Sequence, residues 1–174
     1  MSASLDIEIL ENGALIERLP PTRESISRLE QELRKYDQLD LPLKHTFAPG
    51  AYAREIFLPK GCIVVGKIHK HAHLNIVSRG RVTVVTEFGP REIDAMQAPV
   101  TFTSDAGSKR ALYCHEDTVW TTIHLVQSTD LAEIEREIIA PDYAELDAFM
   151  ARECLRLIDS SGASVDEANP MALP

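Results

Sequence analysis

The chain has 174 residues, of which 44% are apolar and 26% charged, and its 27 acidic and 18 basic side chains give a formal net charge of −9. This composition is typical of one soluble globular domain, and so acidic a chain is not expected to bind nucleic acid. No apolar run approaches the roughly 20 residues that cross a bilayer, and the acidic N-terminus lacks the basic start of a secretory signal, so no membrane association is expected.

The N-terminal part of the chain is expected to form an extension and one helix. Residues 1–24 are read as the extension, which contains the helix-breaking pair Pro20-Pro21. A helix follows from about residue 25 to 36, with Thr22 or Ser25 as its N-cap and apolar residues at helical spacing. The proline-containing segment 37–50 is then expected to lead in extended form into the next region.

Residues 51–127 form the predicted core of the fold, and with the helix they make one domain, 25–127. Short apolar or alternating runs recur there at intervals of about 8 to 12 residues, separated by turn residues. Strands are predicted at 52–57, 62–68, 73–78, 82–87, 100–103, 109–114 and 118–126. Many short strands with glycine-rich turns favour a small antiparallel barrel or sandwich.

Two further helices are expected over 128–158. Thr129 is the predicted N-cap of the first, and Pro141 separates it from the second. Each carries an apolar stripe suited to packing. The tail 159–174 has few apolar residues and is expected to be disordered. The cysteines Cys62, Cys114 and Cys154 form no CxxC pair, which argues against a disulfide framework or a structural zinc finger.

Histidines give the clearest chemical signal in the sequence. His69, His71 and His73 alternate, so in a regular strand all three would lie on one face. Imidazole is a common ligand of divalent transition metals, and three on one face can converge on one ion. The alternative interpretation is a solvated, mildly basic strand face.

The segment from Gly61 to Gly80 resembles the first motif of the cupin superfamily, G-x5-H-x-H-x3-E-x6-G. Both glycines fit, and His69 occupies the position of the second histidine. His73 replaces the glutamate, and Lys67 replaces the first histidine. The resemblance implies an antiparallel jelly roll, mainly β, with short flanking α-helices at both ends, and a mononuclear metal site that includes His69 and His73.

The second cupin motif, P-x-G-x2-H-x3-N, is matched only at Gly107. Asp105 stands in place of the proline, and Arg110 stands in place of the metal-binding histidine. A hairpin of 110–114 with 118–124 would set His124 nearly opposite residue 109 or 110, where it could supply the missing ligand. His71 and His115 are the weaker alternatives.

The segments around both motifs are also similar to small cupin proteins of tailed bacteriophages and prophages. The similar stretches include GKIHKHAHLNIVSRG and SKRALYCHEDTVWTTIH, and the likeness extends over about 25–140. It implies a fold and a site but no particular reaction. The cysteines, without a disulfide framework, predict a cytoplasmic protein, and the resemblance adds a bacterial host or, as the alternative, association with the virion. It also implies a phage or host protein as a partner.

Three functions follow as alternatives. The first is a site for iron, manganese, nickel or zinc that binds a small molecule or catalyses its reaction. The second is a metal-free pocket in which Lys67 and Arg110 bind an anion and Tyr52, Tyr113 and Trp120 line the walls. The third is a structural or protein-interaction role without catalysis. A homodimer or higher oligomer is expected, because an open sheet edge is a natural pairing surface.

Overall fold

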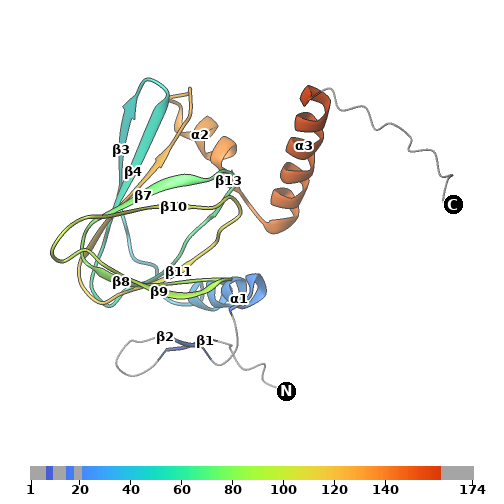
Figure 1. Cartoon of the computed structure of the whole chain (residues 1–174). Coiled ribbons are helices and arrows are strands. Elements are labelled where there is room, and N and C mark those ends of the chain that lie inside the picture. Colours follow the sequence, from blue (N-terminus) through green and yellow to red (C-terminus); the bar gives the residue numbers. More distant parts are fainter. Residues whose placement is uncertain (1–6, 10–14, 18–20, 162–174) are drawn as a thin grey trace, which may run out of the picture.

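The computed structural model describes residues 7–9, 15–17 and 21–161, and its centre is two antiparallel sheets that face each other (Figure 1). The first sheet has the order β10 (Val100–Ser104), β7 (His73–Arg79), β12 (Thr118–His124), β4 (Ala51–Leu58) and β3 (Leu43–Ala48). The second sheet has the order β5 (Ile63–Val65), β11 (Ala111–Cys114), β8 (Arg81–Thr86) and β9 (Gly89–Asp94).

The strand order is that of a jelly roll. If β4, β5 and β7 to β12 are numbered one to eight along the chain, the sheets run six-three-eight-one and two-seven-four-five. The chain therefore crosses repeatedly from one sheet to the other, as in a double Greek key. The predicted mainly β jelly roll, with helices on both sides of the barrel segment in the chain, is confirmed.

The space between the sheets is filled by apolar side chains that alternate along the strands. In β8, Val82 and Val84 point inward to meet Val77 and Trp120 of the first sheet. Val85 follows Val84 and lies on the opposite, outer face of the sheet, where helix α1 (Arg23–Leu33) covers it. Burial on both faces at this point explains why two apolar residues, Val84 and Val85, follow each other in β8.

Thr22 is the N-cap of α1, one of the two predicted candidates. Its hydroxyl accepts a hydrogen bond from the backbone N–H of Ser25 at 3.1 Å, and the Ser25 hydroxyl accepts one from the backbone N–H of Thr22 at 2.8 Å. This reciprocal pair is a capping box, and it starts the helix two residues before the predicted position.

The first of the C-terminal helices packs against one end of the barrel (Figure 1). Asp130, and not the predicted Thr129, caps α2 (Leu131–Ile138), because its carboxylate accepts from the N–H of Glu133 at 2.9 Å. The chain then adds β13 (Ile139–Ala140), which pairs with β6 (Ile68–His69).

Beyond β13, α3 (Tyr143–Ser161) extends away from the barrel (Figure 1). Its first turns pack through Leu146 onto Ile68 and Ala140. The tail predicted to be disordered was 159–174, but residues 159–161 belong to this helix. The rest of the tail, 162–174, lies outside the described residues. No helix in the described part of the chain is long and apolar enough to cross a membrane.

Several strand predictions were wrong. The strands β11 and β12 do not form a hairpin, because the turn between them carries the chain from one sheet to the other. The predicted extended segment before residue 51 contains the strand β3, and the strand β9 was not predicted. The predicted strand 62–68 is interrupted at Gly66, between β5 and β6. In the extension, β1 (Ile7–Ile9) pairs with β2 (Leu15–Glu17).

Candidate metal centre and adjoining cavity

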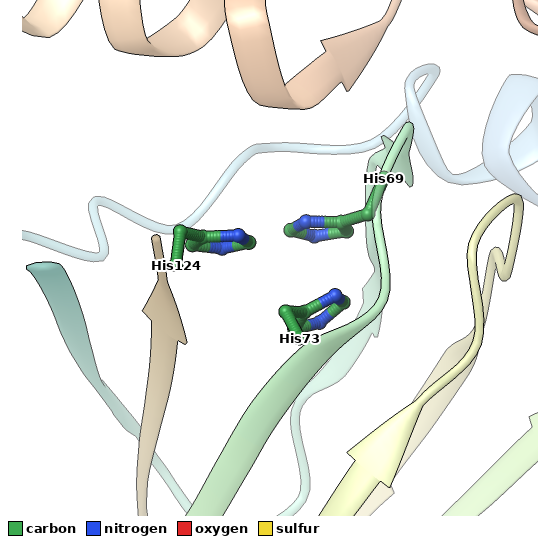
Figure 2. Close-up of side chains that lie close together, drawn as sticks. All are labelled: His69, His73 and His124. Carbon is green, nitrogen blue, oxygen red and sulfur yellow. The ribbon is translucent and has the colours of Figure 1, made fainter. Parts of the chain in front are cut away.

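Three histidines from three strands meet at the end of the barrel that α2 covers (Figure 2). His69 ends β6, His73 begins β7 and His124 ends β12. The ring centroids lie 4.2 Å apart for His69 and His73, 4.7 Å for His73 and His124, and 5.1 Å for His69 and His124. One ring nitrogen of each residue lies within 4.8 Å of one from each of the others. The structure thus brings together the three histidines that the sequence favoured.

Each of these imidazoles has a buried nitrogen with no hydrogen-bond partner: Nδ1 of His69, Nε2 of His73 and Nε2 of His124. The side chains are only 7%, 4% and 3% exposed, respectively. In His73, Nδ1 is 3.2 Å from the backbone carbonyl of His71, which can only accept, so Nδ1 carries the proton and Nε2 carries the lone pair. Buried polar atoms without partners are rare, and three in one place fit the donor set of a metal ion.

Burial also keeps these rings neutral. Desolvation lowers the pKa of His73 to about 4 and that of His124 to about 3, and it lowers the pKa of His69 further still. The nearby guanidinium groups of Arg54 and Arg110 act in the same direction on His69 and His73. Neutral imidazole is the form that binds metal, so the three side chains are ready to act as ligands at neutral pH.

The depressed pKa values predict that the metal-free protein becomes less stable in weak acid. The unfolded chain takes up protons near pH 6.5, whereas folded His73 does so only near pH 4. The stabilisation is therefore complete above pH 6.5 and is lost as the pH falls toward 4. We expect the free energy of unfolding to fall by about 1–2 kcal/mol between pH 7 and pH 5, less than the full shift because buried groups relax on protonation.

Urea unfolding of the metal-free protein at the two pH values measures this effect. Most carboxylates remain ionised above pH 5, so they contribute little in this window. The variant His73→Gln/His124→Gln should lose clearly less stability over the same interval. Equal losses in the two proteins would show that these histidines are not the cause.

The backbone around the cluster explains which histidines enter it. Residues 70–72 leave the strand conformation between β6 and β7, so His71 points outward and meets the ring of Phe149 edge-on at 5.1 Å. The prediction that the three alternating histidines share a face therefore fails at His71. His115 is also elsewhere, with its Nε2 2.7 Å from the hydroxyl of Thr83.

His69 is positioned by partners far away in sequence. It pairs with Ile139 of β13, and its carbonyl accepts from the N–H of Gly107 at 2.7 Å. The N–H of Lys70 donates to the carbonyl of Ile138 at 2.8 Å. His124 lies opposite Tyr52 of β4, on the strand between β4 and β7, and not across from residue 109 or 110 as predicted.

A cavity of about 290 Å³ lies beside the cluster, and His69 and His73 form part of its wall. The volume is at the lower end of the range found for small-molecule pockets. Most of the wall is apolar. It is completed by Leu41, Leu43, Ile56, Leu58, Val64, Val65, Gly66, Leu112, Trp120, Thr122 and the basic residues Arg54, Lys67 and Arg110.

Arg110 belongs to a buried polar network at this cavity. Its guanidinium donates to the side-chain carbonyl of Asn75 at 3.3 Å and to the hydroxyl of Ser104, and it lies 5.5 Å from the ring centroid of Trp120. Asn75 is fully buried and also accepts from the Trp120 indole N–H at 3.0 Å. A residue aligned with a metal ligand in the cupin motif thus lines the same cavity as the histidines.

The other predicted binding residues are placed differently. Lys67 lines the cavity but is 58% exposed and forms an ion pair with Glu135 of α2. Tyr52 packs under α2 and hydrogen-bonds to Nδ1 of His45 at 2.7 Å, and Tyr113 lies against His115. Neither tyrosine is in the cavity wall.

Asn75 and Ser104, which hydrogen-bond to Arg110 at the cavity, were not among the predicted site residues. Asn75 occupies a position between the inward-facing His73 and Val77, so strand alternation alone would have placed it inside. Ser104 gave no such signal, because its role depends on the pairing of β10 with β7, opposite His73.

Comparison with protein-family models finds no match, and comparison with curated proteins also finds none.

Several solved structures are similar to the chain over about half its length. An RmlC-like cupin from Shewanella frigidimarina is 16% identical with a TM-score of 0.41, and the alignment covers 52% of this chain and 78% of that one. A cupin superfamily protein from Desulfitobacterium hafniense is 9% identical with a TM-score of 0.42, covering 52% and 82%. A cupin domain from Bordetella pertussis is 12% identical with a TM-score of 0.42, covering 52% and 98%. The fold assignment itself rests on the strand order described above.

Proposed function

We propose that this protein binds one divalent transition metal through His69, His73 and His124 and binds a small molecule in the adjoining cavity. The observation that carries the proposal is the meeting of three buried imidazole nitrogens that have no hydrogen-bond partner. A structural core would not be expected to leave three such atoms side by side, because each unpaired buried group is costly. A shared metal ion would satisfy all three at once.

The donor set suggests which metals fit and what they would supply. Imidazole suits iron, nickel and zinc, and manganese more often takes carboxylate ligands. Among the described residues, the cluster includes no carboxylate. Three protein ligands leave positions open for water or a small molecule, and a metal held there would polarise a bound carbonyl or water or, if it is iron, activate dioxygen.

Metal content tests the proposal directly. Protein without an affinity tag is incubated in turn with Fe(II), Mn(II), Ni(II) or Zn(II), desalted, and analysed by plasma mass spectrometry. We expect about one metal per chain for at least one of the ions, and at least a tenfold lower content in His69→Ala/His73→Ala.

The matched control is His71→Ala/His115→Ala, which removes the same number of histidines from outside the cluster. It should retain the metal content of the wild type, and circular dichroism should show that both variants fold. Failure of the wild type to take up any of the four ions would rule out the metal site. Equal metal in the two double variants would do the same for the assignment of the ligands.

The predicted relation to phage proteins, the homodimer and a role in protein interaction stay predictions. Size-exclusion chromatography with light scattering would establish the oligomeric state.

A further inference from the structure

Arg110 is a buried cation that has no carboxylate partner in the part of the chain that the structure describes. Its side chain is only 8% exposed, and its hydrogen bonds go to the neutral groups of Asn75 and Ser104. Among the described residues, no carboxylate forms an ion pair with it, and burial alone lowers its pKa to about 10. Arg110 therefore remains charged at neutral pH, in surroundings where an unpaired charge is unfavourable.

The neighbouring basic residues have carboxylate partners, so the missing ion pair is specific to Arg110 and is not shared by the cations around it. Lys109 is equally buried, yet it forms an ion pair with Glu30 of α1. Arg54 and Lys67, which line the cavity with Arg110, both pair with Glu135 of α2. Each of these three cations has a carboxylate partner, whereas Arg110 has none within residues 7–9, 15–17 and 21–161.

Arg110 also has hydrogen-bonding capacity to spare. A guanidinium has five N–H donors, and the bonds to Asn75 and Ser104 use two of them. Three donors remain in a rigid planar group that matches the geometry of a carboxylate. Trp120, whose ring faces the guanidinium, offsets part of the cost of burial but accepts no conventional hydrogen bond.

The rest of the cavity wall adds to the imbalance of charge. The described residues that line it include no Asp or Glu, and aliphatic side chains are the largest group among them. Imidazole binds a metal as a neutral ligand. A divalent ion held by the three histidines would therefore bring two further positive charges, and the cluster includes no carboxylate among the described residues to balance them. A ligand that carries negative charge at one end would compensate the metal and Arg110 together.

We propose that the cavity binds a small organic acid, with its carboxylate on Arg110 and its apolar part against the aliphatic wall. This inference rests on the proposed function and names the class of molecule that the site receives. The apolar wall and the volume of about 290 Å³ favour a compact acid with a hydrocarbon body over inorganic phosphate or sulfate, which would leave the wall without contacts.

Isothermal titration calorimetry with matched acids and amides tests the proposal. The probes are benzoate and hexanoate, with benzamide and hexanamide as neutral counterparts of the same shape, and sodium phosphate and sulfate as inorganic anions. Metal-loaded and metal-free wild-type protein are both titrated, and metal content is measured on each sample. We expect at least one of the two acids to bind, and its amide to bind at least tenfold more weakly.

Arg110→Gln should weaken binding of that acid by at least about 30-fold, because a buried charge pair loses one partner. Lys60→Gln removes the same charge at an exposed ion pair with Glu116, outside the cavity wall, and should bind like the wild type. The comparison of acid with amide needs no variant, so it holds even if Arg110→Gln fails to fold.

The outcomes separate this inference from the metal proposal. Loss of acid binding in Arg110→Gln with metal content unchanged would support the inference. Binding of neither acid, equal binding of acid and amide, unchanged binding in Arg110→Gln, or tighter binding of phosphate or sulfate would each overturn it, whatever the metal content. Absence of metal with acid binding that depends on Arg110 would reject the metal site alone.

Discussion

Replacement of Asn75 by alanine should destabilise the fold by about 3–5 kcal/mol. The side chain is fully buried, and its carbonyl oxygen accepts from the Trp120 indole at 3.0 Å and from Arg110 at 3.3 Å. Its amide donates to the Ser104 hydroxyl at 2.8 Å. Alanine would leave a buried indole N–H and a buried guanidinium without this acceptor, and it would also leave a small cavity.

Denaturant unfolding of the wild type and the variant measures this loss. A double-mutant cycle with Trp120→Phe then tests the mechanism, because phenylalanine removes the N–H that Asn75 accepts. Asn75→Ala should be less costly in the Trp120→Phe background. A cost below about 1 kcal/mol, or the same cost in both backgrounds, would mean that this network contributes little to stability.

Gly80→Ala should cost at least about 3 kcal/mol, because it combines backbone strain with a steric clash. Gly80 alone connects β7 to β8, at the corner where the chain passes from one sheet to the other, and its φ is +109°. A Cβ atom there would lie 2.6 Å from the Cα of Thr118 and 2.7 Å from the carbonyl oxygen of Asp117. These are backbone atoms at the start of β12, and they cannot move aside as a flexible side chain can.

Gly89→Ala is the matched control. Gly89 has nearly the same φ, +111°, but a Cβ there would have no neighbour within 4 Å. This variant should therefore show the conformational cost alone, about 1–2 kcal/mol, and thermal unfolding of the two variants side by side separates the two contributions. Similar losses for both variants would show that the corner at Gly80 adjusts to a methyl group.

The sequence predicted the fold class well because the strand signal is local. Runs such as the one around Val82 and Val84 alternate or stay apolar over the length of a strand, and turn residues separate them. Pairing was harder to predict because it depends on which sheet each strand joins. The turn 115–117 is short enough for a hairpin, yet β11 and β12 separate, and no local pattern distinguishes the two cases.

The three candidate metal ligands were predicted on two different grounds, and one of those grounds was wrong. Spacing from Gly61 and Gly80 singled out His69 and His73. His124 was proposed from a hairpin that does not exist, and it reaches the cluster because β12 lies next to β7. That Arg110 has no carboxylate partner among the described residues could not be predicted from the sequence. It depends on Glu30 of α1 and Glu135 of α2, which pair with Lys109, Lys67 and Arg54 instead.

The pairing of β13 with β6 has a consequence for the order of events during synthesis. The last strand of the jelly roll ends at His124, but the strand partner of His69, Ile139, follows fifteen residues later. Because chains grow from the N-terminus at about 5–20 residues per second, the two sheets can pair while His69 still lacks its β-strand neighbour. The histidine cluster would then be completed only when α2 and β13 have left the ribosome, which makes it a late event in the maturation of this chain.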